Sequence, residues 1–97
     1  MARIILAPQV QIDIHRIFDF LFEHAPDSAV ERVASIICAI DVLQTSPRIG
    51  GALSNGKREL VISTGTSGYV ALYQSVPDLD TALVLAIRSQ REAGYGG

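Results

Sequence analysis

The fold is decided by residues 58–95, which read RELVISTGTSGYVALYQSVPDLDTALVLAIRSQREAGY. Three runs in this stretch, Arg58–Ser63, Tyr69–Gln74 and Thr81–Arg88, are rich in Val, Ile, Leu and Tyr. The segments between them contain Gly, Pro and Asp. Apolar runs of this length, separated by turn residues, are typical of consecutive strands. The stretch therefore predicts a three-stranded antiparallel meander.

Side chains alternate differently in the first and third runs. In the first run, Leu60 and Ile62 share one side of the strand with Arg58, while the other side is more polar. The third run is apolar at every position from Leu83 to Ile87. Such a run is expected either of a central strand covered on both faces or of a strand whose second face binds a partner.

The chain before the meander predicts a short strand and a first helix. The strand Arg3–Ala7 is ended by Pro8, which suits the first turn of a helix. From Gln9 to His24, apolar residues recur at helical spacing, at Val10, Ile14, Ile17, Phe18, Leu21 and Phe22. The charged residues between them, including Asp13, are expected in solvent.

A second helix is predicted to end before Thr45–Pro47, because Pro47 disfavours helix at the residue before it. Its start fits a capping box, Ser28 to Glu31, with Asp27 as the alternative N-cap. Its apolar positions are Val30, Val33, Ile36, Ile37, Ile40 and Leu43. Two helices joined by a few residues form a hairpin, and its apolar stripes must cover the sheet.

Length and composition indicate one α+β domain over residues 1–97. The chain has no spare length for a second core, and with 48% hydrophobic and 19% charged residues it is not of the disordered class. The glycine-rich segment 48–56 is predicted to be a connecting loop. The expected order is an N-terminal strand, a helical hairpin and the three-stranded meander, with the helices packed on one face of the sheet.

The charge balance argues against a chain that binds nucleic acid on its own. The formal net charge is −2, whereas a nucleic-acid binder usually carries a basic stripe. No secretory signal is visible, and no apolar run approaches the roughly 20 residues of a membrane span. We therefore expect a cytoplasmic protein without a membrane partner.

Few residues suggest a metal or a cofactor. Cys38, the single cysteine, allows no disulfide within the chain and is expected in the core. His15 and His24 have no carboxylate at ligand spacing that would close a site, so surface or helix-end roles are expected. The loop 64–68 lacks the Lys and the following helix of a P-loop and is expected to be a hairpin turn. We predict no cofactor and no metal.

The main candidate site follows the third run. Arg88, Arg91 and Tyr95 combine guanidinium groups, which bind phosphates bidentately, with a phenol that can stack on a base or donate a proton. Arg58 would extend this cationic patch from the first run. The alternative is that Arg88 and Arg91 solvate a strand end or pair with Glu92, and that Arg58 is a charged strand start.

The order of these pieces resembles a known family. The segments Arg58–Leu60, Gly68–Tyr73, Val84–Arg88 and Gln90–Tyr95, preceded by the Pro47–Gly50 exit of the second helix, are similar to those of the RelE/ParE superfamily of type II toxin-antitoxin toxins. They resemble the ParE side, the plasmid-stabilisation proteins, more than the RelE side. The resemblance covers nearly the whole chain and implies a growth-arresting toxin.

The resemblance implies two alternative activities. In RelE-type nucleases, several Lys and Arg on the sheet and a C-terminal Tyr stabilise the transition state of ribosome-dependent mRNA cleavage. Only Arg91 and Tyr95 match that set, because Glu59, Val61 and Val70 stand where such toxins have cations. A ParE-like protein that binds DNA gyrase and has no catalytic residues is therefore the preferred interpretation. A RelE-like endoribonuclease is the alternative, and a degenerate toxin that only binds antitoxin is a third.

The resemblance also implies a protein partner. A ParD-like antitoxin, expected to be a ribbon-helix-helix protein, would lay an amphipathic segment across the helices and the sheet. Ile12, Phe20 and Ile49 are apolar but lie outside the predicted core stripes, which makes them its expected footprint. Tyr69 and Tyr73 share one side of the second run and belong either to the core or to this groove.

Overall fold

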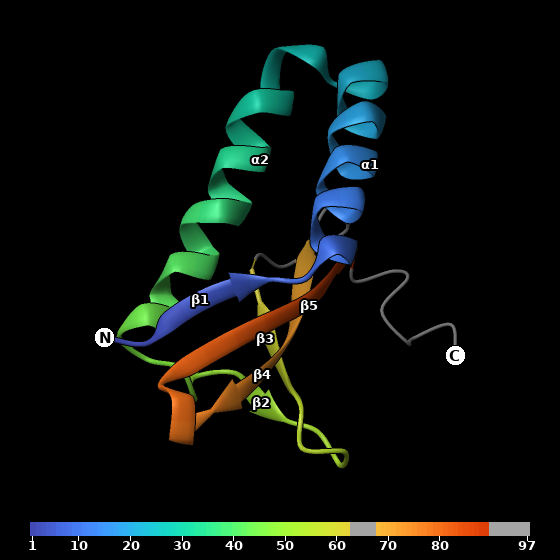
Figure 1. The fold of residues 1–97 in the computed structure, drawn as a ribbon. Coiled ribbons are helices and arrows are strands. Elements are labelled where there is room, and N and C mark those ends of the chain that lie inside the picture. The colour runs from blue at the N-terminus through green and yellow to red at the C-terminus, as the bar shows by residue number, and fades with distance from the viewer. Residues whose placement is uncertain (63–67, 90–97) are drawn as a thin grey trace.

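The computed structural model describes residues 1–62 and 68–89 of the chain (Figure 1). The predicted α+β order is confirmed. In these ranges the elements are β1 (Arg3–Leu6), α1 (Pro8–His24), α2 (Pro26–Asp41), the 3-10 turn η1 (Val42–Gln44), β2 (Gly51–Ala52), β3 (Arg58–Val61), β4 (Tyr69–Val76), the 3-10 turn η2 (Pro77–Leu79) and β5 (Thr81–Ser89).

The strands form one sheet in the order β1-β5-β4-β3-β2. The meander β3-β4-β5 is antiparallel as predicted, and β1 joins it in parallel beside β5. The segment 48–56 was predicted to be a loop throughout, but Gly51 and Ala52 pair with β3 as an additional edge strand. The strand β5 has β1 on one side and β4 on the other. This is the central position that its apolar run suggested.

The helical hairpin packs on one face of the sheet and builds the core with it. Figure 1 shows the turn between α1 and α2 as the part of the hairpin farthest from the strands. Residues from both helices and from β3, β4 and β5 form one cluster, with Val10, Ile36, Leu43, Tyr73, Val84 and Ile87 among its most buried members. Leu60, on the more apolar side of the first run, is buried, whereas Val61 on the other side is exposed.

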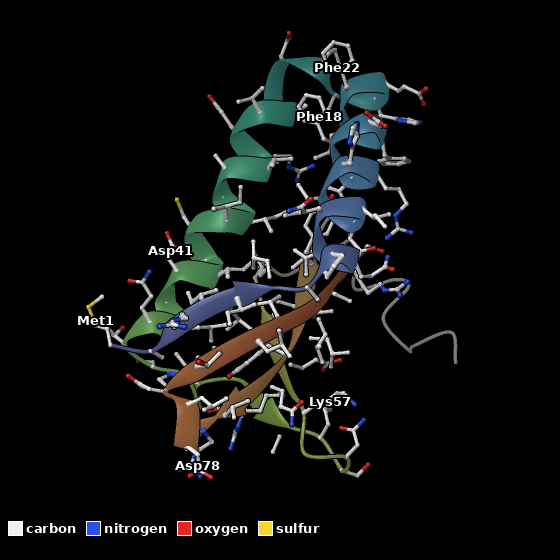
Figure 2. The ribbon with its side chains drawn as sticks, in the orientation of Figure 1. Met1, Phe18, Phe22, Asp41, Lys57 and Asp78 are labelled. Carbon is white, nitrogen blue, oxygen red and sulfur yellow. The ribbon has the colours of Figure 1, made fainter. Side chains whose placement is uncertain are left out.

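Several residues that were predicted to be buried lie at the surface. Phe22, Val30 and Ile37 belong to the predicted apolar stripes but are exposed, and so is Cys38. Phe18 and Phe22 lie at the end of α1 farthest from the sheet (Figure 2), with ring centroids 5.8 Å apart. The far end of the hairpin has no strand beneath it, so apolar residues there have less to cover.

The start of α2 also differs from the prediction. The helix begins at Pro26, whose fixed φ suits the first helical position, and no side-chain hydrogen bond caps it. The Ser28 hydroxyl donates to the carbonyl of Ala25 instead of forming the predicted capping box. No helix in residues 1–62 and 68–89 is long and apolar enough to cross a membrane.

Candidate functional site

The structure places the predicted cations on different faces of the sheet. Arg88 is exposed near the end of β5 and pairs in register with Val70 of β4. Arg58 pairs with Tyr73, whose side chain lies in the core beneath the helices. Because successive side chains of a strand point to opposite faces, Arg58 and Arg88 do not share the cationic patch that was suggested for them. Arg91, Glu92 and Tyr95 lie outside the described residues.

The surroundings of Arg88 are apolar or acidic in the described part of the chain. Its neighbour across the pair is Val70, and Val70 in turn pairs with Val61 of β3. Glu59 points to this same face, two residues before Val61. The described strands therefore bring together one guanidinium group, two valine side chains and a carboxylate here.

Arg58 is held by backbone carbonyls beside the core. One of its guanidinium nitrogens, Nη1, donates to the carbonyl oxygens of Arg48, at 3.2 Å, and Gly50, at 2.8 Å. The amide of Gly50 donates to the buried hydroxyl of Tyr73 at 2.9 Å. These bonds fix the turn between η1 and β2 on the sheet, and Ile49 is exposed in this turn. The geometry gives Arg58 a structural task.

Replacing Arg58 by methionine is expected to lower the free energy of unfolding by about 1–2 kcal/mol. The substitution removes two charge-assisted hydrogen bonds but keeps much of the apolar stem, and partial exposure of the group limits the loss. Urea unfolding measures the change. The neighbouring substitution Lys57→Met is the control, and an equal loss in both variants would contradict the assigned role of Arg58.

The predicted antitoxin footprint divides into exposed and buried residues. Ile12, Phe20 and Ile49 are all more than half exposed, at 60%, 58% and 57%. Tyr69 and Tyr73 are buried in the core, so of the two alternatives the core placement is the one observed. Their side chains are not accessible to a partner in this conformation.

Further exposed apolar residues on the helices were not in the predicted footprint. Val30 and Ile37 lie on α2 and Phe22 ends the apolar stripe of α1.

Phe20 stacks on the ring of His24, with centroids 4.2 Å apart. His15 lies 3.8 Å from the carboxylate of Asp19 at the surface, so the expected surface placement of both histidines is confirmed.

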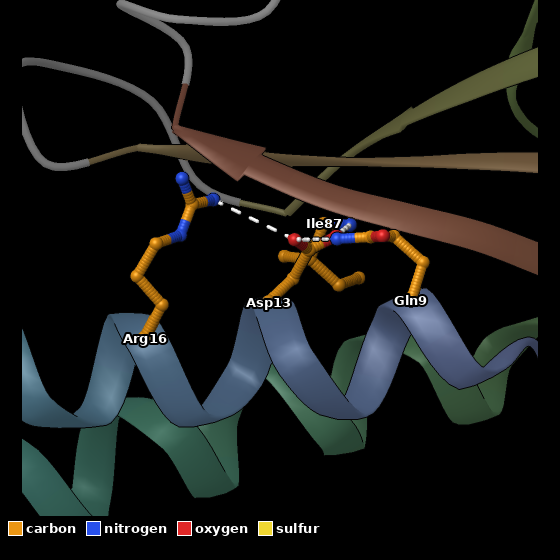
Figure 3. A network of polar contacts seen from close by, with 4 residues as sticks. All are labelled: Gln9, Asp13, Arg16 and Ile87. Atoms are coloured by element: carbon orange, nitrogen blue, oxygen red, sulfur yellow. Dashed lines mark hydrogen bonds and ion pairs between the residues drawn. The ribbon is translucent and has the colours of Figure 1, made fainter.

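One buried polar network was missed by the sequence analysis. Asp13 was expected in solvent, yet it is only 1% exposed and lies between α1 and β5. Figure 3 shows its carboxylate between Gln9 and Arg16, facing the backbone of Ile87. Its partner in β5 lies 74 residues away along the chain, and no local pattern reports such a contact.

Comparison with known sequences decides the family. The sequence profile of the family described as "ParE toxin of type II toxin-antitoxin system, parDE" matches residues 4–94. The chain belongs to the ParE toxin family. A curated relative of this ParE-family chain, Toxin RelE3 of Caulobacter vibrioides, is 30% identical over 86 residues, which cover 89% of the chain and 90% of the relative. The resemblance to the RelE/ParE superfamily is thus confirmed.

Solved structures share the fold of the ParE-family chain. A chain of the chromosomal ParDE toxin-antitoxin system of P. aeruginosa superposes with a TM-score of 0.76 at 18% identity, covering 92% of this chain and 96% of that one. A chain of the intact E. coli RelBE toxin-antitoxin complex gives a TM-score of 0.57 at 15% identity, with the same coverage. At these identities the similarity is one of fold.

Proposed function

We propose that this ParE-family chain is a toxin that arrests growth by binding DNA gyrase in the cytoplasm, and that a ParD-like antitoxin neutralises it. The observation that carries the choice of target is the environment of Arg88. In the described strands, Val70, Val61 and Glu59 occupy the face beside it. Val70 is only 2% exposed, so the accessible side chains here are those of Arg88, Val61 and Glu59. A surface of this composition favours binding another protein over cutting a phosphodiester bond.

The charge requirement of RNA cleavage supports this preference. The pentacovalent transition state concentrates negative charge on the phosphate, and preorganised cations stabilise it by a few kcal/mol each. On the described part of this face, the Glu59 carboxylate would oppose that charge and the two valines would do nothing for it. Strands arranged in this way supply little of the stabilisation that an endoribonuclease needs.

The exposed apolar residues of the helices support a protein partner. Ile12, Phe20, Phe22, Val30 and Ile37 expose large side chains on the two helices. Exposed apolar side chains of this kind are typical of interaction sites, and an amphipathic segment of a partner is well suited to bury them. Two proteins of the same fold come from toxin-antitoxin systems. A short upstream reading frame that encodes a ribbon-helix-helix protein would identify the antitoxin and mark the pair as a plasmid-stabilisation type of module.

Purified toxin is expected to inhibit DNA supercoiling by gyrase and to accumulate cleaved DNA complexes. The expected inhibition develops at toxin concentrations comparable to the enzyme and is reversed by prior addition of the antitoxin. Toxin premixed with antitoxin is the control. Full supercoiling at a large excess of toxin would refute gyrase as the target.

Ribosome-dependent mRNA cleavage is the second candidate. It is favoured by the identity to a toxin named RelE3 and by the presence of Arg91 and Tyr95 in the sequence. Primer extension on cellular mRNA after induction tests it, since an endoribonuclease would leave codon-specific ends that Arg91→Ala and Tyr95→Phe abolish. Growth arrest on expression of the toxin alone excludes the third interpretation, a degenerate toxin that only buffers antitoxin.

A further inference from the structure

Asp13 makes contacts that tie helix α1 to the end of strand β5. Its Oδ2 accepts a hydrogen bond from the backbone amide of Ile87 at 3.0 Å. Its Oδ1 accepts a hydrogen bond from Nε2 of Gln9 at 2.9 Å and lies 3.6 Å from Nη2 of Arg16 (Figure 3). A buried carboxylate is unfavourable unless its oxygens are occupied, and here donors reach both.

The place of this contact follows from the length of β1. The strand β1 ends at Leu6, and the last backbone bond on its side of β5 runs from the Ala7 amide to the Val84 carbonyl at 2.8 Å. Beyond Val84, β5 continues to Ser89 without β1 beside it. The register of β5 against β4 also shifts between Leu72 and Tyr73. The Ile87 amide therefore lies past the end of its neighbouring strand.

Asp13 supplies the acceptor that a longer β1 would have provided. Buried amides are almost always paired, and the carboxylate on the second turn of α1 reaches the Ile87 amide. A carboxylate has no donor of its own, so it accepts hydrogen bonds from Ile87 and Gln9 without conflict and also forms an ion pair with Arg16. The Asp13 side chain thereby adds a polar link between the end of β5 and α1 to their apolar packing.

We propose that Asp13 is a positioning residue for target binding. Arg88 follows Ile87 directly, and its side chain points to the opposite face of the sheet, where it is exposed. Holding the Ile87 backbone in place therefore also holds the Cα atom from which the Arg88 side chain extends. This inference rests on the proposed function, in which Arg88 contacts the target.

The test compares Asp13→Ala and Asp13→Asn with Asp19→Ala, which removes an exposed carboxylate from the same helix. In Asp13→Ala, hydrogen exchange of the Ile87 amide in purified toxin is expected to accelerate about tenfold or more. Toxicity in the cell should fall about tenfold, while affinity for the antitoxin changes less than about threefold. The Asn variant keeps one acceptor oxygen and should restore Ile87 protection and toxicity together, and Asp19→Ala should behave as the wild type.

Two results would overturn the proposal. The first is an Asp13→Ala variant that loses toxicity and antitoxin affinity in parallel, because Asp13 would then only maintain the fold. The second is an Asn variant that keeps the Ile87 amide protected but loses toxicity. In that case the charge of Asp13, and not the position of β5, would matter for toxicity. The Asn variant decides the question even if the alanine variant does not fold. Growth arrest and gyrase inhibition are measured separately. A wild-type toxin that arrests growth without inhibiting gyrase would refute gyrase as the target. The effect of the Asp13 variants on growth arrest would still test the role of Asp13.

Discussion

Replacing Gly50 by alanine is expected to lower the free energy of unfolding by about 2–3 kcal/mol. A Cβ at this position would lie 2.8 Å from the backbone oxygen of Glu59 and 2.8 and 2.9 Å from Cε1 and the hydroxyl oxygen of Tyr73. The Tyr73 ring is fully buried and the Glu59 oxygen belongs to a paired strand, so neither gives way easily. Urea unfolding followed by circular dichroism measures the loss.

The neighbouring glycine provides a matched control. A Cβ at Gly51 meets nothing within 4 Å, so Gly51→Ala should change stability by no more than about 0.5 kcal/mol. Because both substitutions add one methyl group to adjacent glycines, their difference isolates the steric conflict. Equal unfolding midpoints for the two variants would show that the turn relaxes and that the close approach to Tyr73 is unimportant.

Replacing Arg88 by glutamate is expected to reduce toxicity about tenfold or more, with antitoxin affinity changed less than about threefold. Arg88 is exposed at the end of β5, so reversing its charge leaves the core intact and acts on whatever binds there. The antitoxin is expected to be held mainly by burial of apolar residues on the helices, which a charge at the strand end affects little. Colony counts after induction and calorimetric titration with the antitoxin measure the two effects.

The control for Arg88→Glu is Arg3→Glu. Arg3 is also exposed, but it lies beside Thr81 at the other end of β5. The same change of net charge there should leave toxicity close to that of the wild type. Parallel loss of toxicity and antitoxin binding in Arg88→Glu would mean that this strand end does not distinguish the two partners.

Local periodicity predicted most of the secondary structure. The alternation in residues 58–88 and the helical spacing after Pro8 located the helices and the meander strands closely, because each pattern reports which side of one element meets the core. The side-by-side placement of β1 and β5 has no local signal, since the two strands stand at opposite ends of the chain. The burial of Asp13 depends on that placement and was missed for the same reason.

The candidate site was predicted only in part. The alternation of side chains along the strand already placed Arg58 on the side of Leu60. The structure adds that the Arg58 guanidinium donates a hydrogen bond to the turn that contains Gly50. The exposure of Val30 and Cys38 depends on which side of α2 turns toward the sheet. Packing between the helix and the strands decides which side this is, and the apolar stripe of one helix does not predict it.

The position of β5 between β1 and β4 bears on how a cell makes this protein safely. The strand β5 is synthesised after both helices and completes the interior of the sheet, so the helices lack part of the surface on which they pack until β5 has been made. A nascent chain that stops before Thr81 lacks the strand that carries Arg88 and the partner of Asp13. Products that end before Thr81 are therefore expected to be harmless and short-lived.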